Sequence, residues 1–143
     1  MTVRDWPDPP AAGDIVWCHF PDGVHPRSKP RPVLVVNVYG KQAPFAVRVA
    51  YGTSQRVRDL FGGEFAILQT NSPAAFALAN LSYDTKFDLR QQVDLPYTTE
   101  WFSAPPHAPH GQAPRLGTLH PSLMRAVEAA HQAVVARRQT KQP

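Results

Sequence analysis

The sequence has little cysteine and no long apolar run. Cys18 is the only cysteine, which excludes an intrachain disulfide and a multi-cysteine zinc site. It lies in an apolar, strand-like run, so we expect a buried and unreactive thiol. No apolar run approaches the roughly 20 residues that a membrane-spanning helix needs. Residues 1–12 carry prolines and acids rather than a basic segment and then an apolar one, so we expect no secretory signal and a cytoplasmic protein.

The charge balance is modest. The 15 lysines and arginines exceed the 11 acidic residues by four, which permits a polyanionic partner without requiring one. A chain of 143 residues, 43% of them hydrophobic, suits one compact domain. We expect a flexible lead-in over residues 1–12, a single domain over 13–138 and a short tail over 139–143.

Short strand-like runs dominate the first half of the chain. They are rich in β-branched and aromatic residues, and glycine and proline separate them; they lie near residues 14–20, 32–39, 45–51 and 64–69. Strands at this spacing predict a mainly β fold, either a small barrel or a strongly bent sheet.

The second half of the chain gives fewer signals. Residues 74–82 suit either a strand or a short helix, and residues 87–95 alternate as one more strand. The proline-rich segment 103–116, which holds His107 and His110, is expected to be an irregular loop, and we expect no metal there. A helix is predicted from Pro121 onward, with an apolar face formed by Leu123, Val127, Ala130 and Val134.

Two polar clusters adjoin neighbouring strands. Lys29-Pro30-Arg31-Pro32 leads into one, and Gly52-Thr53-Ser54-Gln55 closes the next. The arginine side chain presents a planar fork of donors that matches phosphate oxygens, and hydroxyls add further donors. Converging side chains of this kind would bind a phosphodiester and stabilise the extra charge of its transition state. A surface arginine and an ordinary Gly-Thr-Ser turn explain the same residues, so the residues alone leave both readings open.

The order of these segments resembles the MazF/PemK (Kid-like) toxins of type II toxin–antitoxin systems. Gly13-Asp14-Ile15-Val16-Trp17 looks like their opening strand. A loop, the run Arg31-Pro32-Val33-Leu34-Val35-Val36 and a strand ending in Thr53-Ser54-Gln55 then follow as in that family. The resemblance covers residues 13–55, and residues 81–102 look like a divergent PemK-like branch.

The resemblance implies a fold and an activity. The fold is an SH3-like small barrel with a terminal helix packed on it, as a homodimer in the cytoplasm. The activity is cleavage of single-stranded RNA to a 2′,3′-cyclic phosphate and a 5′-hydroxyl, with no metal or other cofactor. A cognate antitoxin would hold the toxin inactive by covering Arg31.

The family's catalytic arginine matches Arg31, and its phosphate-binding threonine matches Thr53. Arg31 is expected to stabilise charge and transfer a proton, while Thr53 holds the phosphate. The side chains expected to bind RNA around them are His25, Arg27, Lys29, Ser54 and Gln55. The basic loop 21–30 departs from many relatives, so the RNA sequence preference does not carry over.

Two rival functions remain open. One is a non-catalytic RNA- or protein-binding module on the same fold. The other is a toxin that poisons gyrase through its terminal helix. Loss of RNA cleavage in an Arg31→Ala variant would favour the nuclease, and dependence on residues near Arg137 would favour the gyrase poison.

Overall fold

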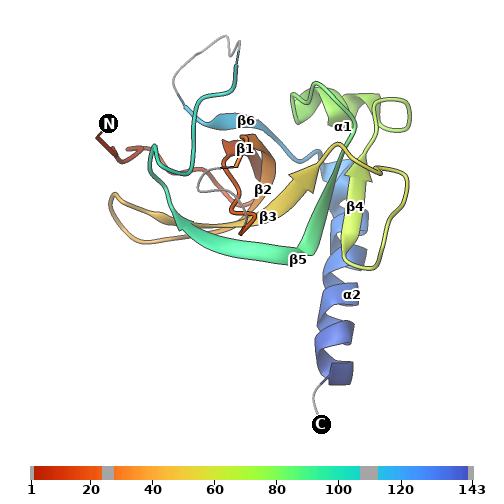
Figure 1. Cartoon of the computed structure of the whole chain (residues 1–143). Helices are drawn as coiled ribbons and strands as arrows, with labels where there is room; N and C mark the ends of the chain where they lie inside the picture. Colours follow the sequence, from red (N-terminus) through yellow and green to blue (C-terminus); the bar gives the residue numbers. More distant parts are fainter. Residues whose placement is uncertain (1, 24–27, 107–112, 142–143) are drawn as a thin grey trace.

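The computed structural model describes residues 2–23, 28–106 and 113–141. Within these ranges six strands form one antiparallel sheet, which bends into a half-barrel (Figure 1). The strands are β1 (Asp14–Cys18), β2 (Arg31–Tyr39), β3 (Ala46–Thr53), β4 (Glu64–Ile67), β5 (Thr85–Pro96) and β6 (Arg115–Thr118), in the sheet order β4-β5-β3-β2-β1-β6. The predicted mainly β fold is confirmed.

The sheet is buried on both faces. Successive side chains of a strand point to opposite faces, so the adjacent residues Ile15 and Val16, both fully buried, belong to different apolar clusters. One cluster includes Phe65 and Phe87 and contains side chains from both helices. The other cluster includes Phe102. Burial on both faces explains why the strands read as apolar runs rather than as a strict alternation.

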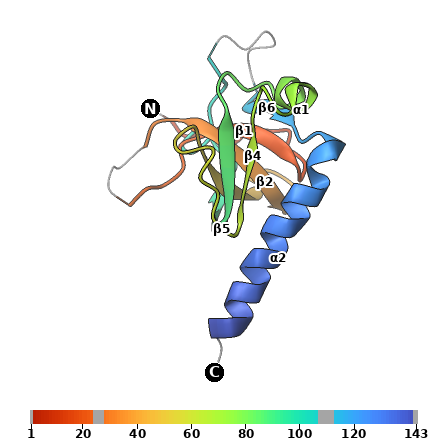
Figure 2. The ribbon, with the colours of Figure 1, turned by 90° about the vertical axis from the view of Figure 1, so that its right-hand side faces the viewer.

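The predicted terminal helix is confirmed. Pro121 opens a 3-10 turn, Pro121–Leu123, which leads into α2 (Met124–Lys141). Leu123, Ala130 and Val134 are buried against the first apolar cluster, as the sequence spacing predicts. Helix α2 runs beside β4, and its C-terminal part extends past the sheet (Figure 2). The helix reaches Lys141, and the expected domain boundary at residue 138 stays a prediction.

The structure decides the open choice for residues 74–82 and corrects the expectation for the end of the segment 103–116. The open choice for residues 74–82 is settled as a short helix, α1 (Pro73–Leu78). The expectation of an irregular loop up to residue 116 is wrong at its end, because Arg115 opens β6, which pairs with β1. Gly117 allows this strand to form, since a Cβ there would lie 2.4 Å from the carbonyl carbon of Ala79 behind α1.

The N-terminal segment lies along the end of β5. The backbone N–H of Arg4 donates to Thr99 Oγ1 at 2.9 Å, and the Trp6 indole N–H donates to the Phe102 carbonyl at 3.0 Å. The expected flexibility of residues 1–12 stays a prediction. Among the described residues, no helix is long and apolar enough to cross a membrane.

Candidate functional site

The β2–β3 pairing brings the two polar clusters together. The described pairing ends with Leu34 and Ala50, and beyond this pair the start of β2 with Arg31 and the end of β3 with Thr53 line one pocket. The strands approach closely here, because a Cβ on Gly52 would lie only 2.1 Å from the Pro32 carbonyl oxygen. Gly52 is therefore the residue that allows both ends of the hairpin to meet.

A pocket of about 710 Å³ opens at this end of the hairpin. Its lining comes from β1, β2, β3, β6 and the segment before β5: Trp17, Lys29, Pro30, Arg31, Pro32, Gly52, Thr53, Ser54, Gln55, Leu81, Ser82, Tyr83, Thr85, Pro105, Pro106 and Leu116. Five predicted site residues lie among them, namely Lys29, Arg31, Thr53, Ser54 and Gln55. The described lining holds two cationic side chains and no carboxylate, so it favours an anion.

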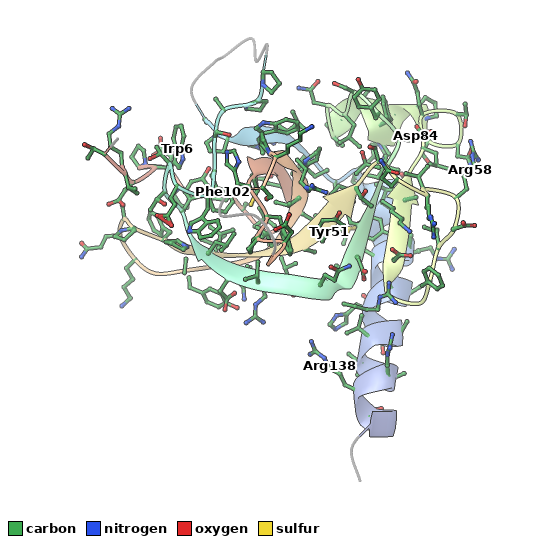
Figure 3. All side chains as sticks on the ribbon, in the orientation of Figure 1. Trp6, Tyr51, Arg58, Asp84, Phe102 and Arg138 are labelled. Carbon is green, nitrogen blue, oxygen red and sulfur yellow. The ribbon has the colours of Figure 1, made fainter. Side chains whose placement is uncertain are left out.

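Tyr51 fixes the direction of the Arg31 side chain. Nη1 of Arg31 donates a hydrogen bond to the Tyr51 hydroxyl at 2.7 Å, and the guanidinium carbon lies 5.1 Å from the centre of the ring. The ring itself packs edge-on against Phe20 with centroids 5.3 Å apart. Figure 3 labels Tyr51 inside the bend of the sheet. A hydrogen bond and a cation–π contact, both with Tyr51 of β3, thus hold the Arg31 guanidinium in place.

One donor of the Arg31 guanidinium has no protein partner among the described residues. This donor is Nε, which is buried. An unpaired buried donor destabilises a protein, and such groups call for a specific explanation. Nε and Nη2 together form the edge that two phosphate oxygens occupy in a bidentate contact. An anion bound there would satisfy the orphaned donor.

Thr53 and its neighbours form a turn at the end of β3. The backbone N–H of Gln55 donates to Thr53 Oγ1 at 3.1 Å, which fixes the hydroxyl as an acceptor of that bond. A hydroxyl that accepts a hydrogen bond still has its own proton to donate. Ser54 and Gln55 are exposed, and Thr53 is partly buried. The turn therefore presents hydroxyl donors next to Arg31.

A buried charge network separates a third cation from the pocket. Lys86 pairs with Thr53 across β3 and β5, but its ammonium is held 3.0 Å from Glu64 Oε2. Asp88 accepts three hydrogen bonds from Arg90, one from the backbone N–H and two from the guanidinium, each at 2.9 Å. Burial raises the pKa of Asp88, but hydrogen bonds from Arg90 and Gln91 lower it by more, so the net pKa lies below its usual range. These charges neutralise one another and leave Arg31 and Lys29 as the cations of the pocket.

Two predicted site residues cannot be placed. His25 and Arg27 lie outside the described residues, as do His107 and His110. His19 has a structural position: it is buried, and its Nδ1 lies 2.8 Å from the Ser28 carbonyl oxygen, which ties the end of the 21–30 loop to β1. Cys18 is fully buried, and burial raises the pKa of its thiol far above the usual range. The expectation of a buried thiol is confirmed.

Sequence reasoning missed Tyr51 and Tyr83. Tyr51 shares a strand face with Thr53 two residues later, which is the signal that would have found it. Tyr83 lines the pocket with 74% of its surface exposed, and no local pattern marks it. Among other aromatic residues, Phe20 and Phe102 are buried, and Trp17 lines the pocket.

Comparison with known proteins agrees with this geometry. Residues 11–99 match the family model described as the PemK-like, MazF-like toxin of type II toxin–antitoxin systems. The match spans β1 to β5 and contains Arg31, Thr53 and Tyr51. A search of the curated proteins gives no match. The fold and site define a small β protein whose pocket is lined by Arg31, Lys29 and hydroxyl side chains. The chain belongs to the PemK/MazF-like toxin family of type II toxin–antitoxin systems.

Proposed function

We propose that the protein is a metal-independent endoribonuclease that cleaves single-stranded RNA at the pocket around Arg31 and Thr53. The carrying observation is that all five predicted site residues within the described ranges line one pocket. Family membership supports the same activity.

The RNA supplies the nucleophile. Its 2′-hydroxyl attacks the adjacent phosphorus and gives up its proton, and the bond to the 5′-oxygen of the next nucleotide breaks while that oxygen takes up a proton. A 2′,3′-cyclic phosphate and a 5′-hydroxyl result, and Arg31 is the residue proposed to assist the proton transfer. Arg31 binds the phosphate through the Nε edge and stabilises the additional negative charge of the transition state. Thr53, helped by Ser54, holds a phosphate oxygen, and Lys29 attracts the neighbouring backbone. His25, Arg27 and Gln55 extend the RNA contact.

A cognate antitoxin would inhibit the enzyme by covering Arg31, and the active form would be a homodimer. Light scattering on the purified toxin tests the dimer, with a mass of twice 15.8 kDa as the expected result. A single-chain mass would contradict that part of the proposal.

Cleavage of a long single-stranded RNA in the presence of EDTA tests the activity. We expect wild type to cut, and Arg31→Ala and Thr53→Ala to lose cutting while circular dichroism shows that both variants are still folded at the assay temperature. Arg125→Ala is the matched control, because Arg125 is an exposed arginine on α2. Intact RNA with folded, antitoxin-free wild type would overturn the nuclease and favour the binding module on the same fold. Gyrase poisoning that depends on α2 would favour the third reading.

A further inference from the structure

The pocket is larger and more apolar than a phosphate requires. Its volume of about 710 Å³ falls in the range of roughly 300–1,000 Å³ that accommodates whole small molecules. Beside the polar residues of the hairpin, a second group of lining residues is apolar or aromatic: Trp17, Leu81, Tyr83, Pro105, Pro106 and Leu116. A ligand that matches both groups carries an anion next to a flat, largely apolar ring.

Tyr83 is the most exposed large hydrophobic side chain among the described residues. It is 74% exposed, and among the large exposed hydrophobic side chains of the described residues it is the one that lines this pocket. Water contacts most of its ring, so stacking a planar partner on it would remove apolar surface from water.

The backbone under Tyr83 is fixed from both sides. Helix α1 ends with Asn80 at φ +55°, where the Leu81 N–H bonds to the Phe76 carbonyl and the Asn80 N–H to the Ala77 carbonyl. These two bonds are the pattern of a Schellman cap, and they direct Leu81 into the core.

On the other side, the Thr85 hydroxyl donates to the Tyr83 carbonyl at 2.8 Å. The side chain of Asp84 accepts a hydrogen bond from the backbone N–H of Gln69 at 2.8 Å, and Figure 3 labels Asp84 beside α1 and β4. An exposed ring on a fixed backbone binds a partner with a small loss of entropy.

We propose that Tyr83 is a stacking platform for the nucleobase next to the phosphate held by Arg31 and Thr53. The inference rests on the proposed function and adds a base subsite to it. Stacking on an aromatic ring tolerates any base but favours purines by their larger faces, so Tyr83 biases which phosphodiester reaches Arg31.

Binding of a fluorescent, uncleavable strand tests the subsite independently of cleavage. The probe is a single-stranded RNA dodecamer with degenerate flanks and a central 2-aminopurine. Every 2′-hydroxyl of the strand is replaced by a 2′-methoxy group, which removes the nucleophile at all positions. Stacking quenches 2-aminopurine. We expect wild type and Tyr83→Phe to quench it, and Tyr83→Ala to bind it roughly 5- to 150-fold more weakly with little quenching. Tyr39→Ala is the matched control, because Tyr39 is also exposed but lies at the far end of β2.

The outcomes separate the subsite from the nuclease. Quenching that depends on Tyr83 supports the subsite whether or not the wild type cuts RNA. Equal quenching and equal affinity in wild type and Tyr83→Ala overturn the subsite, and RNA cutting by both proteins would leave the nuclease standing. Absence of both probe binding and RNA cleavage by folded wild type overturns both proposals. Because Tyr83 is exposed, we expect Tyr83→Ala to unfold at the wild-type denaturant concentration.

Discussion

Replacement of Gly52 by alanine forces the two strands of the site apart. The added Cβ would lie 2.1 Å from the Pro32 carbonyl oxygen and 3.0 Å from Cε1 of Phe87. Ordinary contact begins at 3.4 Å, so relief at the Pro32 oxygen requires a movement of about 1.3 Å. The closer atom belongs to the backbone of β2, and a rotamer change cannot remove the clash.

The movement should reduce both stability and activity. Overpacking of this kind destabilises a core by about 1–3 kcal/mol. A displacement near 1 Å between groups that act on one substrate costs on the order of 100-fold in rate. We expect Gly52→Ala to unfold at lower denaturant and, at a temperature where it is still folded, to cleave RNA about 100-fold more slowly.

Gly62→Ala is the matched control for this experiment. A Cβ on Gly62 would meet Ala133 Cβ at 3.5 Å, an ordinary contact, so stability and cleavage should stay near wild type. The measurements are urea denaturation followed by circular dichroism, and initial cleavage rates. A Gly52→Ala protein that unfolds and cleaves like wild type would refute the reasoning that the close approach of β2 and β3 builds the site.

Three further predictions follow from single side chains. Tyr51→Phe keeps the ring but removes the 2.7 Å bond that directs the Arg31 side chain. We expect kcat to fall about tenfold with KM nearly unchanged, which corresponds to a loss of about 1.4 kcal/mol of transition-state stabilisation, and an unchanged kcat would contradict the positioning role. Burial raises the pKa of Asp88, but hydrogen bonds from Arg90 and Gln91 lower it by more. The ionised Asp88 therefore stabilises the folded protein above about pH 4, and this contribution is lost as the pH falls through the lowered pKa. Asp88→Asn should therefore flatten the acid limb of a plot of unfolding free energy against pH, and an unaltered limb would show that other groups determine it. The Cys18 thiol is fully buried with a raised pKa, so it should resist Ellman's reagent at neutral pH until the protein unfolds; rapid labelling of the folded protein would show that β1 opens.

Local sequence patterns predicted the elements whose causes are local. The strands β1 to β4 are marked by runs rich in β-branched and aromatic residues with glycine and proline between them, and β5 is marked by the alternation of residues 87–95. The terminal helix is marked by Pro121 and an apolar face. The meeting of Arg31 and Thr53 also follows from the sequence, because neighbouring antiparallel strands joined by a short connection place the start of one beside the end of the next.

Features that depend on distant contacts escaped prediction. Strand β6 has only four residues, and its pairing with β1 depends on the close approach of Gly117 to Ala79. The place of Tyr83 in the pocket depends on the cap that ends α1 and on the bond from Thr85. The orphaned Nε of Arg31 is a consequence of three-dimensional packing that leaves no mark on the sequence.

The chemistry of the cut ends tests the central claim most directly. RNA fragments produced by wild type in EDTA should carry 2′,3′-cyclic phosphate and 5′-hydroxyl ends in mass spectra, and these fragments should be absent with Arg31→Ala but present with Arg125→Ala. Fragments with 3′-hydroxyl and 5′-phosphate ends, or the same fragments from Arg31→Ala, would contradict cleavage by the 2′-hydroxyl at the Arg31 pocket.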